Sequence, residues 1–341
     1  MFKRLITALI AGAAVLSCTL TCFAEKKMEV VKTELAVPQK VVFVGDSIAA
    51  GVGLEGYNGT GSNPPSCYAS ILGEQYKKEL DGTCEGLMRN GAVSGDTSDN
   101  LLDRLEKGEL DDYLFGSNAV VISIGGNDIM KPALNFLSED LGLKTQEDIK
   151  NFDTSKLANP ATLSKINDQL QQISENLTNF KINVPKIINA IRSKTEAVIV
   201  FQTVYNPLDS NKSIAMLSNI IGEKITELNG IIESNSKNQD GSLNYLVCDV
   251  HKEFAGKSKE LTNIDQYDIH PNAEGHKVIS KLVDEQLRSR KYSYEELVEV
   301  DTEKDGSKKM SNTRIYLTIG LFFGGFITLF VIVWVKFKRN Q

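Results

Sequence analysis

The stretch Val41-Val42-Phe43-Val44-Gly45-Asp46-Ser47 decides the fold. Its first part is β-branched or aromatic and apolar on both faces, which predicts a strand covered by helices on both sides. The Gly-Asp-Ser triplet that follows predicts a tight turn at the end of this strand. Open α/β sheets expose their functional groups at the carboxyl ends of their strands. Ser47 is therefore the first candidate for a functional residue.

Four more short apolar runs alternate with stretches of helical periodicity. This alternation is typical of βαβ units and a mostly parallel sheet. We therefore expect a three-layer α/β/α sandwich over residues 41–290, with a five-stranded sheet in a flavodoxin-like strand order. The length of 341 residues allows one such domain plus tails. The further strands are expected at residues 86–90, 119–124, 197–204 and 244–249.

A long stretch without a strand, about residues 129–195, interrupts this alternation. Its apolar residues recur at steps of three and four, which predicts an amphipathic helix. The helix either packs on the sheet as an insertion or forms a cap over the functional site, and its position after the carboxyl end of a strand slightly favours the cap. The periodic residues are Leu163, Ile166, Leu170, Ile173 and Leu177.

The N-terminal residues have the features of a secretory signal peptide. A basic start is followed by a short apolar run and by small or cysteine residues at Cys22 and Ala24. We expect a signal peptide over residues 1–24 and a linker over residues 25–40. The mature domain is then expected outside the cell.

The C-terminal residues predict a membrane anchor. Residues 315–335 form an uncharged apolar run that is long enough, at about 1.5 Å per residue, to cross a hydrocarbon core of about 30 Å. The cationic tail 336–341 is expected on the cytoplasmic side, and the acidic segment 291–314 reads as a charged spacer. A single-pass protein of the cell membrane is expected, with a possible weak homodimer through Gly320 and Gly324.

The charge and the cysteine content of the chain limit which partners and which metal sites can be expected. A net charge of −6 without a basic stripe argues against a nucleic-acid partner. Removal of the signal peptide would leave Cys67, Cys84 and Cys248, which allow at most one intramolecular disulfide. We expect the pair Cys67–Cys84. No Cys/His cluster has the spacing of a zinc site, so no metal is expected.

Three further blocks of polar residues follow predicted strands. Gly95 lies in the block after the second strand, where its N–H group could face a shared cleft, although an ordinary turn would look the same. Asn127 follows the third strand and could donate its amide N–H to an oxyanion, although a helix N-cap would also use Asn there. The last block runs from Asp268 to His276.

Three histidines are available to activate a serine hydroxyl, which is a weak nucleophile until a base removes its proton. His276 lies in the helix that Asn272 is predicted to cap, on its polar side, so we expect it on the exposed surface. His251 has no obvious partner in the sequence. His270 is the candidate base.

The four blocks, in this order and each after a strand, resemble the SGNH/GDSL hydrolase family over about residues 41–290. The resemblance implies that Ser47 is the nucleophile and His270 the general base. It also implies an oxyanion hole formed by the N–H groups of Ser47 and Gly95 and by the side chain of Asn127. No metal or organic cofactor is needed.

One position departs from the family pattern of Asp-x-x-His. Three residues before His270 this chain has Tyr267, and Asp268 lies only two residues before it. Residues two apart in an extended segment point the same way, so we expect Asp268 to orient His270. Asp265 or a backbone carbonyl are the alternatives.

Together with the expected signal peptide and membrane span, the resemblance predicts a membrane-anchored, extracellular serine esterase or lipase that acts on carboxylic esters. Acetylated glycans, lipid acyl groups and small esters are all compatible substrates. A non-catalytic glycan- or lipid-binding protein on the same scaffold is the alternative, but it predicts a missing nucleophile, base or Asn, and none is missing. A structural protein with incidental turns would place Ser47 and His270 far apart.

Overall fold

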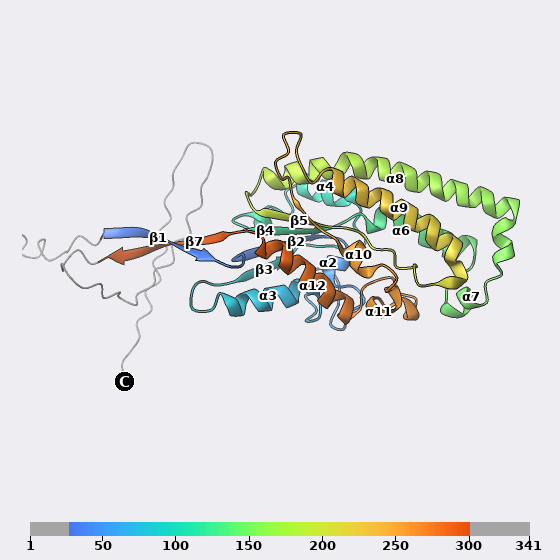
Figure 1. Ribbon diagram of the computed structural model, residues 1–341, viewed down its shortest axis with the longest axis horizontal. Helices are drawn as coiled ribbons and strands as arrows, with labels where there is room; N and C mark the ends of the chain where they lie inside the picture. The colour runs from blue at the N-terminus through green and yellow to red at the C-terminus, as the bar shows by residue number, and fades with distance from the viewer. Residues whose placement is uncertain (1–26, 301–341) are drawn as a thin grey trace, which may run out of the picture. The chain divides into compact units, whose positions relative to one another are not determined.

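A five-stranded parallel sheet is the centre of the fold. The computed structural model describes residues 27–300, and they fall into two units, one of which spans residues 35–292. The sheet of this unit has the order β3-β2-β4-β5-β6 (Figure 1), with every neighbouring pair parallel. The strands are β2 (Lys40–Gly45), β3 (Leu87–Asn90), β4 (Ala119–Ser123), β5 (Val198–Gln202) and β6 (Leu246–Cys248). The predicted sheet and its flavodoxin-like order fit this arrangement.

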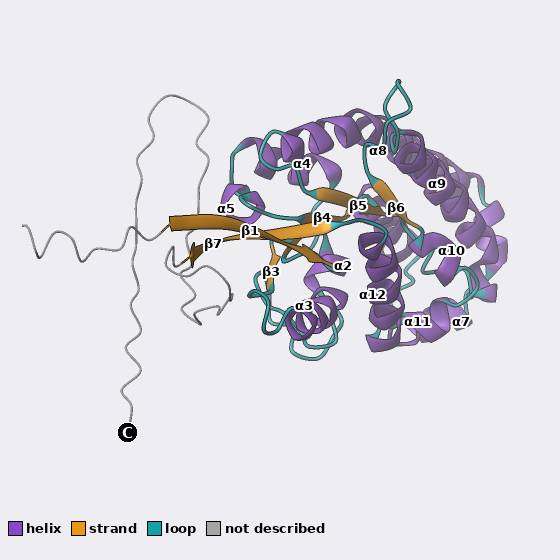
Figure 2. Ribbon diagram, turned by 60° about the vertical axis from the view of Figure 1, so that its left-hand side comes forward, coloured by secondary structure: helices purple, strands orange, loops and turns teal. Residues whose placement is uncertain are grey.

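Helices cover both faces of the sheet and complete the three layers (Figure 2). The long helices α8 and α9 pack together on one face with α4 and α6, whereas α3 and α12 pack together on the other. The longer helices are α3 (Tyr68–Glu79), α4 (Ser98–Glu106), α6 (Gly126–Asn135), α8 (Pro160–Arg192), α9 (Ala215–Ser234) and α12 (Ala273–Arg288).

Short helices occupy the connections, most of them near the carboxyl ends of the strands. They are α2 (Ser47–Ala50), α5 (Asp111–Leu114), the π-helix η1 (Phe136–Asp140), α7 (Gln146–Lys150), α10 (Val250–Phe254) and α11 (Ser258–Leu261), with the 3₁₀ turns η2 (Thr154–Ala158), η3 (Lys212–Ile214) and η4 (Ile264–Gln266).

The region without strands, about residues 129–195, has two parts with different positions. The predicted amphipathic helix is α8, whose residues Phe180, Val184 and Ile187 are fully buried. Burial of each such side chain contributes roughly 1.5–3 kcal/mol, so α8 is an ordinary covering helix of the sandwich. The segment between α6 and α8 instead reaches the loop that carries His270, as described below.

The second unit contributes a separate pair of strands. Strands β1 (Lys27–Leu35) and β7 (Tyr292–Val300) form a two-stranded sheet. Lys32 of β1 forms an ion pair with Glu295 of β7 at 3.4 Å. Strands thus occupy parts of the segments that the sequence suggested as linker and charged spacer.

The prediction of a single-pass membrane protein is corrected. No helix within residues 27–300 combines the length and the apolar composition needed to cross a bilayer. The longest of these helices, α8, carries charged side chains along its length, including Lys165, Asp168 and Lys181. The predicted signal peptide and the predicted span at residues 315–335, with Gly320 and Gly324, lie outside the described residues.

The predicted Cys67–Cys84 disulfide is also wrong. Cys67 is a buried free thiol, and its Sγ atom lies 3.5 Å from the carbonyl oxygen of Ala49. The residue precedes α3 and packs against the turn after β2, which fixes its position. Spacing in the sequence contains no information about this packing.

Candidate active site

The turn after β2 is joined tightly to the end of β4. Gly45 has a φ of 126°, and a Cβ atom at this position would lie 1.8 Å from the carbonyl oxygen of Ser123. Only glycine allows this approach. The Asp46 N–H donates to the same Ser123 oxygen at 2.9 Å, and the Ser123 hydroxyl donates to Asp46 Oδ1 at 3.1 Å. The start of α2, and with it Ser47, is therefore fixed to the centre of the sheet.

Asp46 supports this turn from inside the protein. Its Oδ1 atom caps α2 by accepting the N–H of Ile48 at 3.1 Å. Burial raises the pKa of the Asp46 carboxyl to about 7, although the hydrogen bonds from Ile48 and Ser123 oppose this shift. Its contacts give Asp46 a structural role in placing Ser47, which is 8% exposed.

The loop after β3 lies beside the same turn. The Val93 N–H donates to the Gly45 carbonyl at 2.9 Å, and the Asn90 side chain donates to the Ala49 carbonyl at 2.7 Å. These bonds place Gly95 near α2. Gly95 has a φ of 84°, and there are no atoms within 4 Å of the position that a Cβ would take, so the space on that side of the residue is open.

The structure brings Asn127 next to Gly95. Its Nδ2 atom donates to the Asp96 carbonyl at 2.9 Å, and Lys131, one turn later on α6, donates to the Gly95 carbonyl at 2.7 Å. The N-cap of α6 is Gly125, so Asn127 is not the cap that its position in the sequence also allowed. An Asn side chain has two N–H groups, so one remains for a ligand.

Asp128 strengthens this part of the site without facing it. Its carboxylate is buried and accepts the hydroxyl of Ser98 at 2.6 Å and the Ser98 N–H at 3.0 Å. Burial raises the pKa of Asp128 to about 6, against the effect of the Ser98 bonds. Asp128 thus joins α6 to the start of α4, behind Gly95 and Asn127.

Asp268 and His270 form a pair in the loop between η4 and α12. Asp268 Oδ1 lies 2.5 Å from His270 Nδ1 and also accepts the His270 N–H at 3.1 Å. Burial of Asp268 opposes its charge, but the hydrogen bond and the charge of His270 outweigh it and hold the pKa of the carboxyl below its usual value. The carboxylate is therefore ionised at neutral pH. His270 keeps Nε2 for another partner.

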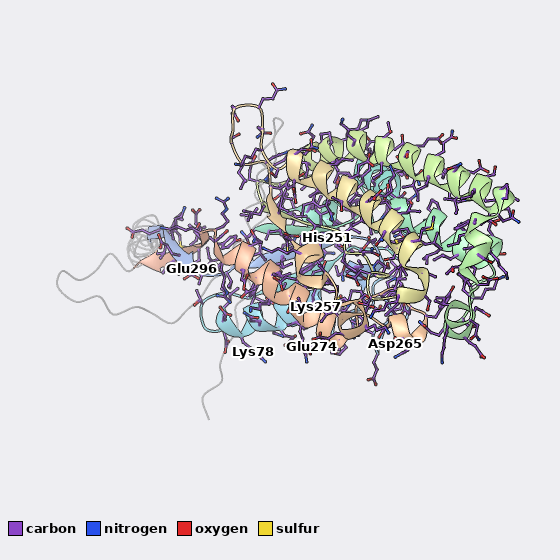
Figure 3. The ribbon with its side chains drawn as sticks, turned by 45° about the vertical axis from the view of Figure 1, so that its right-hand side comes forward. Lys78, His251, Lys257, Asp265, Glu274 and Glu296 are labelled. Atoms are coloured by element: carbon purple, nitrogen blue, oxygen red, sulfur yellow. The ribbon has the colours of Figure 1, made fainter. Side chains whose placement is uncertain are left out.

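The alternative orienter, Asp265, forms no ion pair with His270 within residues 27–300. It is exposed, belongs to η4 and lines a cavity beside this loop. In Figure 3 its side chain lies at the lower right of the domain, away from His251. Of the acidic residues that the sequence offered as partners for His270, Asp268 is the one in contact with it.

Contacts to Gly53 place this pair against the segment that follows Ser47. The Asn263 side chain donates to the Gly53 carbonyl at 3.1 Å. A Cβ atom on Gly53 would lie 2.7 Å from Asp268 Oδ2 and 3.2 Å from His270 Cβ. The Val52 N–H donates to the Ser47 carbonyl at 3.0 Å. Within residues 27–300 no hydrogen bond joins the Ser47 hydroxyl to the His270 ring; such bonds are often long before a substrate binds.

Two tyrosines hold the His270 loop, and the motifs did not reveal their roles. The Tyr205 hydroxyl donates to the Ile269 carbonyl at 2.8 Å. Tyr267 has a φ of 60°, unusual for a residue other than glycine, and its hydroxyl donates to the Leu143 carbonyl. Tyr205 lies shortly after β5, and Tyr267 was notable in the sequence only as a departure from the family pattern.

The predicted exposure of His276 is wrong. The side chain is completely buried. Its Nδ1 atom accepts the N–H of Tyr68 at 3.3 Å. Its ring stacks on the Tyr68 ring, with 5.9 Å between the ring centroids. Burial lowers the pKa of His276 to about 3. The side of α12 that looked polar therefore packs against α3. His251 lies on α10 and lines a different cavity, together with Asn206.

Comparison with known proteins identifies the family. Residues 43–278 match the GDSL-like Lipase/Acylhydrolase family, and the chain belongs to it. A curated relative, the protein YpmR of Bacillus subtilis, is 24% identical over 264 residues, which cover 76% of this chain and 86% of that protein. The matched region contains the turn at Ser47, the Gly95 and Asn127 loops and His270.

Solved structures share the fold at low sequence identity. An extracellular lipase from Streptomyces rimosus has a TM-score of 0.52 at 16% identity, with coverage of 73% of this chain and 99% of that one. The lipase Lip_vut3 from a goat rumen metagenome has a TM-score of 0.50 at 17% identity, covering 72% and 96%. At this identity the likeness shows a shared fold alone.

Proposed function

We propose that this protein is a serine esterase that hydrolyses carboxylic esters. Membership in a family of lipases and acylhydrolases supports hydrolase chemistry. The observation that carries the proposal is the 2.5 Å contact between Asp268 Oδ1 and His270 Nδ1. An ionised carboxylate at Nδ1 leaves Nε2 of the neutral ring free to act as a base, which is the role of the Asp–His pair in serine hydrolases.

In the proposed acylation step, Nε2 of His270 accepts the proton of the Ser47 hydroxyl while Ser47 Oγ bonds to the carbonyl carbon of the ester. The tetrahedral intermediate collapses when its alkoxy group leaves and takes the proton from His270. The acyl group remains on Ser47. Asp268 stays ionised and stabilises the imidazolium that forms transiently.

In the deacylation step, His270 removes a proton from a water molecule, whose oxygen attacks the acyl carbon. The carboxylic acid then leaves, and the proton on His270 returns to Ser47 Oγ. No metal ion or organic cofactor enters either step. Every proton that His270 takes is given back, so the enzyme ends in its starting state.

The oxyanion of both intermediates is proposed to be stabilised by the N–H groups of Ser47 and Gly95 and by Nδ2 of Asn127. The contact of Asn127 with the Asp96 carbonyl supports this, because it holds the amide beside Gly95. One preorganised donor of this kind contributes about 2.7–4 kcal/mol to transition-state stabilisation.

Hydrolysis of p-nitrophenyl acetate, butyrate and a longer-chain ester by the wild type and by Ser47→Ala tests the proposal. We expect turnover by the wild type, a preference among the chain lengths, and loss of turnover in the variant to the background rate. Equal rates in both proteins would contradict the role of Ser47. Absence of turnover in both would favour a binding protein on the same scaffold.

A further inference from the structure

A polar cavity of about 520 Å³ lies beside the His270 loop. Its buried lining includes the apolar side chains of Ile149 from α7 and Ile264 from η4, while the exposed Asp265, Lys259 and Asn151 also line it. The volume lies within the range of small-molecule sites. The cavity is therefore large enough for one or two sugar rings.

This cavity is built from the same loop as the proposed catalytic pair. Ile264 and Asp265 belong to the segment that continues into Asp268 and His270, and the Asn263 N–H donates to the His270 carbonyl at 2.9 Å. The loop is therefore closed on itself, and the cavity lies a few residues from the proposed base.

The opposite wall comes from the segment between α6 and α8. The Gln146 side chain of α7 donates to the Ile264 carbonyl, and the Tyr267 hydroxyl donates to the Leu143 carbonyl. These two bonds hold the wall against the His270 loop. The segment that the sequence suggested as a cap thus forms one side of a cavity next to the proposed active site.

The lining suits a ligand that is rich in hydroxyl groups. The amides of Asn151 and Asn211 can both donate and accept, Asp265 accepts, and the ammonium groups of Lys150 and Lys259 donate. Within residues 27–300 neither lysine nor Asp265 forms an ion pair, so these charged groups are available to a ligand. A sugar hydroxyl is both donor and acceptor and can satisfy each of them.

One apolar pocket of the described residues is much smaller than this cavity. The apolar pocket lined by Phe136, Ile173 and Leu217 has a volume of only about 30 Å³, which is the space of one or two water molecules. This pocket is therefore too small to hold a long acyl chain.

We propose that the cavity between α7 and η4 binds the alcohol part of the substrate, and that this part is a carbohydrate. The inference rests on the proposed esterase function and adds the substrate class to it. The ester group of an acylated oligosaccharide would lie at Ser47 and a neighbouring sugar unit in the cavity. On release, the sugar hydroxyl takes its proton from His270, as in the general mechanism.

The test compares a cavity variant with a matched control. The cavity variant carries Asp265→Ala and Lys259→Ala. The control carries Glu274→Ala and Lys257→Ala, which remove the same charges from exposed positions outside the cavity; Figure 3 shows Glu274 and Lys257 on the same side of the domain as Asp265. The readout is kcat/KM for a partially O-acetylated cellotetraose divided by kcat/KM for p-nitrophenyl acetate.

We expect this ratio to fall roughly tenfold or more in the cavity variant, because two charged hydrogen-bond partners are lost, and to remain at the wild-type value in the control. An unchanged ratio in the cavity variant overturns the inference. Wild-type hydrolysis of p-nitrophenyl acetate without hydrolysis of the acetylated sugar also overturns it, while the proposed esterase function stands.

Binding to Ser47→Ala separates this inference from the proposed function. Titration calorimetry with the same acetylated cellotetraose should give a Kd that rises roughly tenfold when the two cavity substitutions are added to Ser47→Ala. This result would support the cavity even if no ester is turned over. Equal Kd values with and without the cavity substitutions would overturn the inference.

Discussion

Asp268 Oδ1 lies 2.5 Å from His270 Nδ1, although only one residue separates the two in the chain. The backbone makes this possible, because the His270 N–H also donates to the Asp268 carboxylate at 3.1 Å and the Asp268 N–H donates to the Asn263 carbonyl at 3.2 Å. The turn at Tyr267, with its φ of 60°, precedes this compact arrangement. An Asp-x-His sequence therefore achieves the contact that the family pattern forms with one more residue.

Substitution of Asp268 by Asn should lower kcat for p-nitrophenyl acetate by about 10⁴-fold, because the amide no longer selects the tautomer with a free Nε2. Steady-state kinetics at neutral pH measure the effect, and far-UV circular dichroism checks that the variant is folded. The same measurement on Asp265→Asn is the comparison. If Asp265→Asn lowered kcat by this factor and Asp268→Asn had a kcat near that of the wild type, Asp265 would be the residue that orients His270.

Substitution of Asn127 by Ala should lower kcat by about 10²–10³-fold with little change in KM, because the proposed contact strengthens only when the oxyanion forms. Lys131→Ala is a matched control on the same helix, since Lys131 donates to the Gly95 carbonyl and also supports that loop. An equal loss of kcat in both variants would mean that Asn127 acts only by holding the loop.

Substitution of Gly45 by Ala should destabilise the fold by roughly 3 kcal/mol or more, because the new Cβ would lie 1.8 Å from the Ser123 carbonyl oxygen. Gly59→Ala is the control, since Gly59 has a similar φ of 117° but no atom within 4 Å of the added carbon. Urea unfolding measures both. Similar losses in the two variants would show that the backbone angle, and not the contact with β4, requires glycine.

His276 should make the stability depend on pH. Its pKa is lowered to about 3 by burial, whereas it is about 6.5 in an unfolded chain. Between these two pKa values the unfolded state binds one more proton than the folded state. The contribution of His276 to the free energy of unfolding therefore falls as the pH falls, by about 1.4 kcal/mol per pH unit. Above the pKa of the unfolded state, His276 makes its full contribution to stability.

Urea unfolding of the wild type and His276→Asn between about pH 6 and pH 4 tests this, because Asn retains an acceptor for the Tyr68 N–H. Asp46 and Asp128 have raised pKa values that act in the opposite direction, but both proteins contain them and their effects cancel in the difference. The stability advantage of the wild type should shrink as the pH falls. A constant difference would mean that His276 is not buried in the neutral form.

The sheet could be predicted because each strand is recognisable from its own short run of residues. The runs around Phe43 and Val121 are apolar on both faces, and only a strand between two helical layers needs such a pattern. The positions of Ser47, Gly95 and Asn127 follow from this sheet, since the carboxyl ends of its strands lie along one edge.

The remaining features depend on contacts between residues far apart in the chain. His276 looked exposed because its helix neighbours are polar, and its burial requires Tyr68 at the start of α3. The contact of Tyr267 with Leu143 joins two segments with no shared periodicity. Sequence patterns report the environment of a side chain along its own element, and these side chains are placed by another element.

Covalent trapping of the nucleophile tests the central claim most directly. The wild type is incubated with an alkyl fluorophosphonate, which phosphonylates an activated serine with loss of fluoride, and the adduct is located by peptide mass spectrometry. We predict one adduct on Ser47, with loss of esterase activity in proportion to labelling, and no adduct in Ser47→Ala or after prior denaturation. An adduct on a different residue, or esterase activity that survives complete labelling of Ser47, would contradict the account.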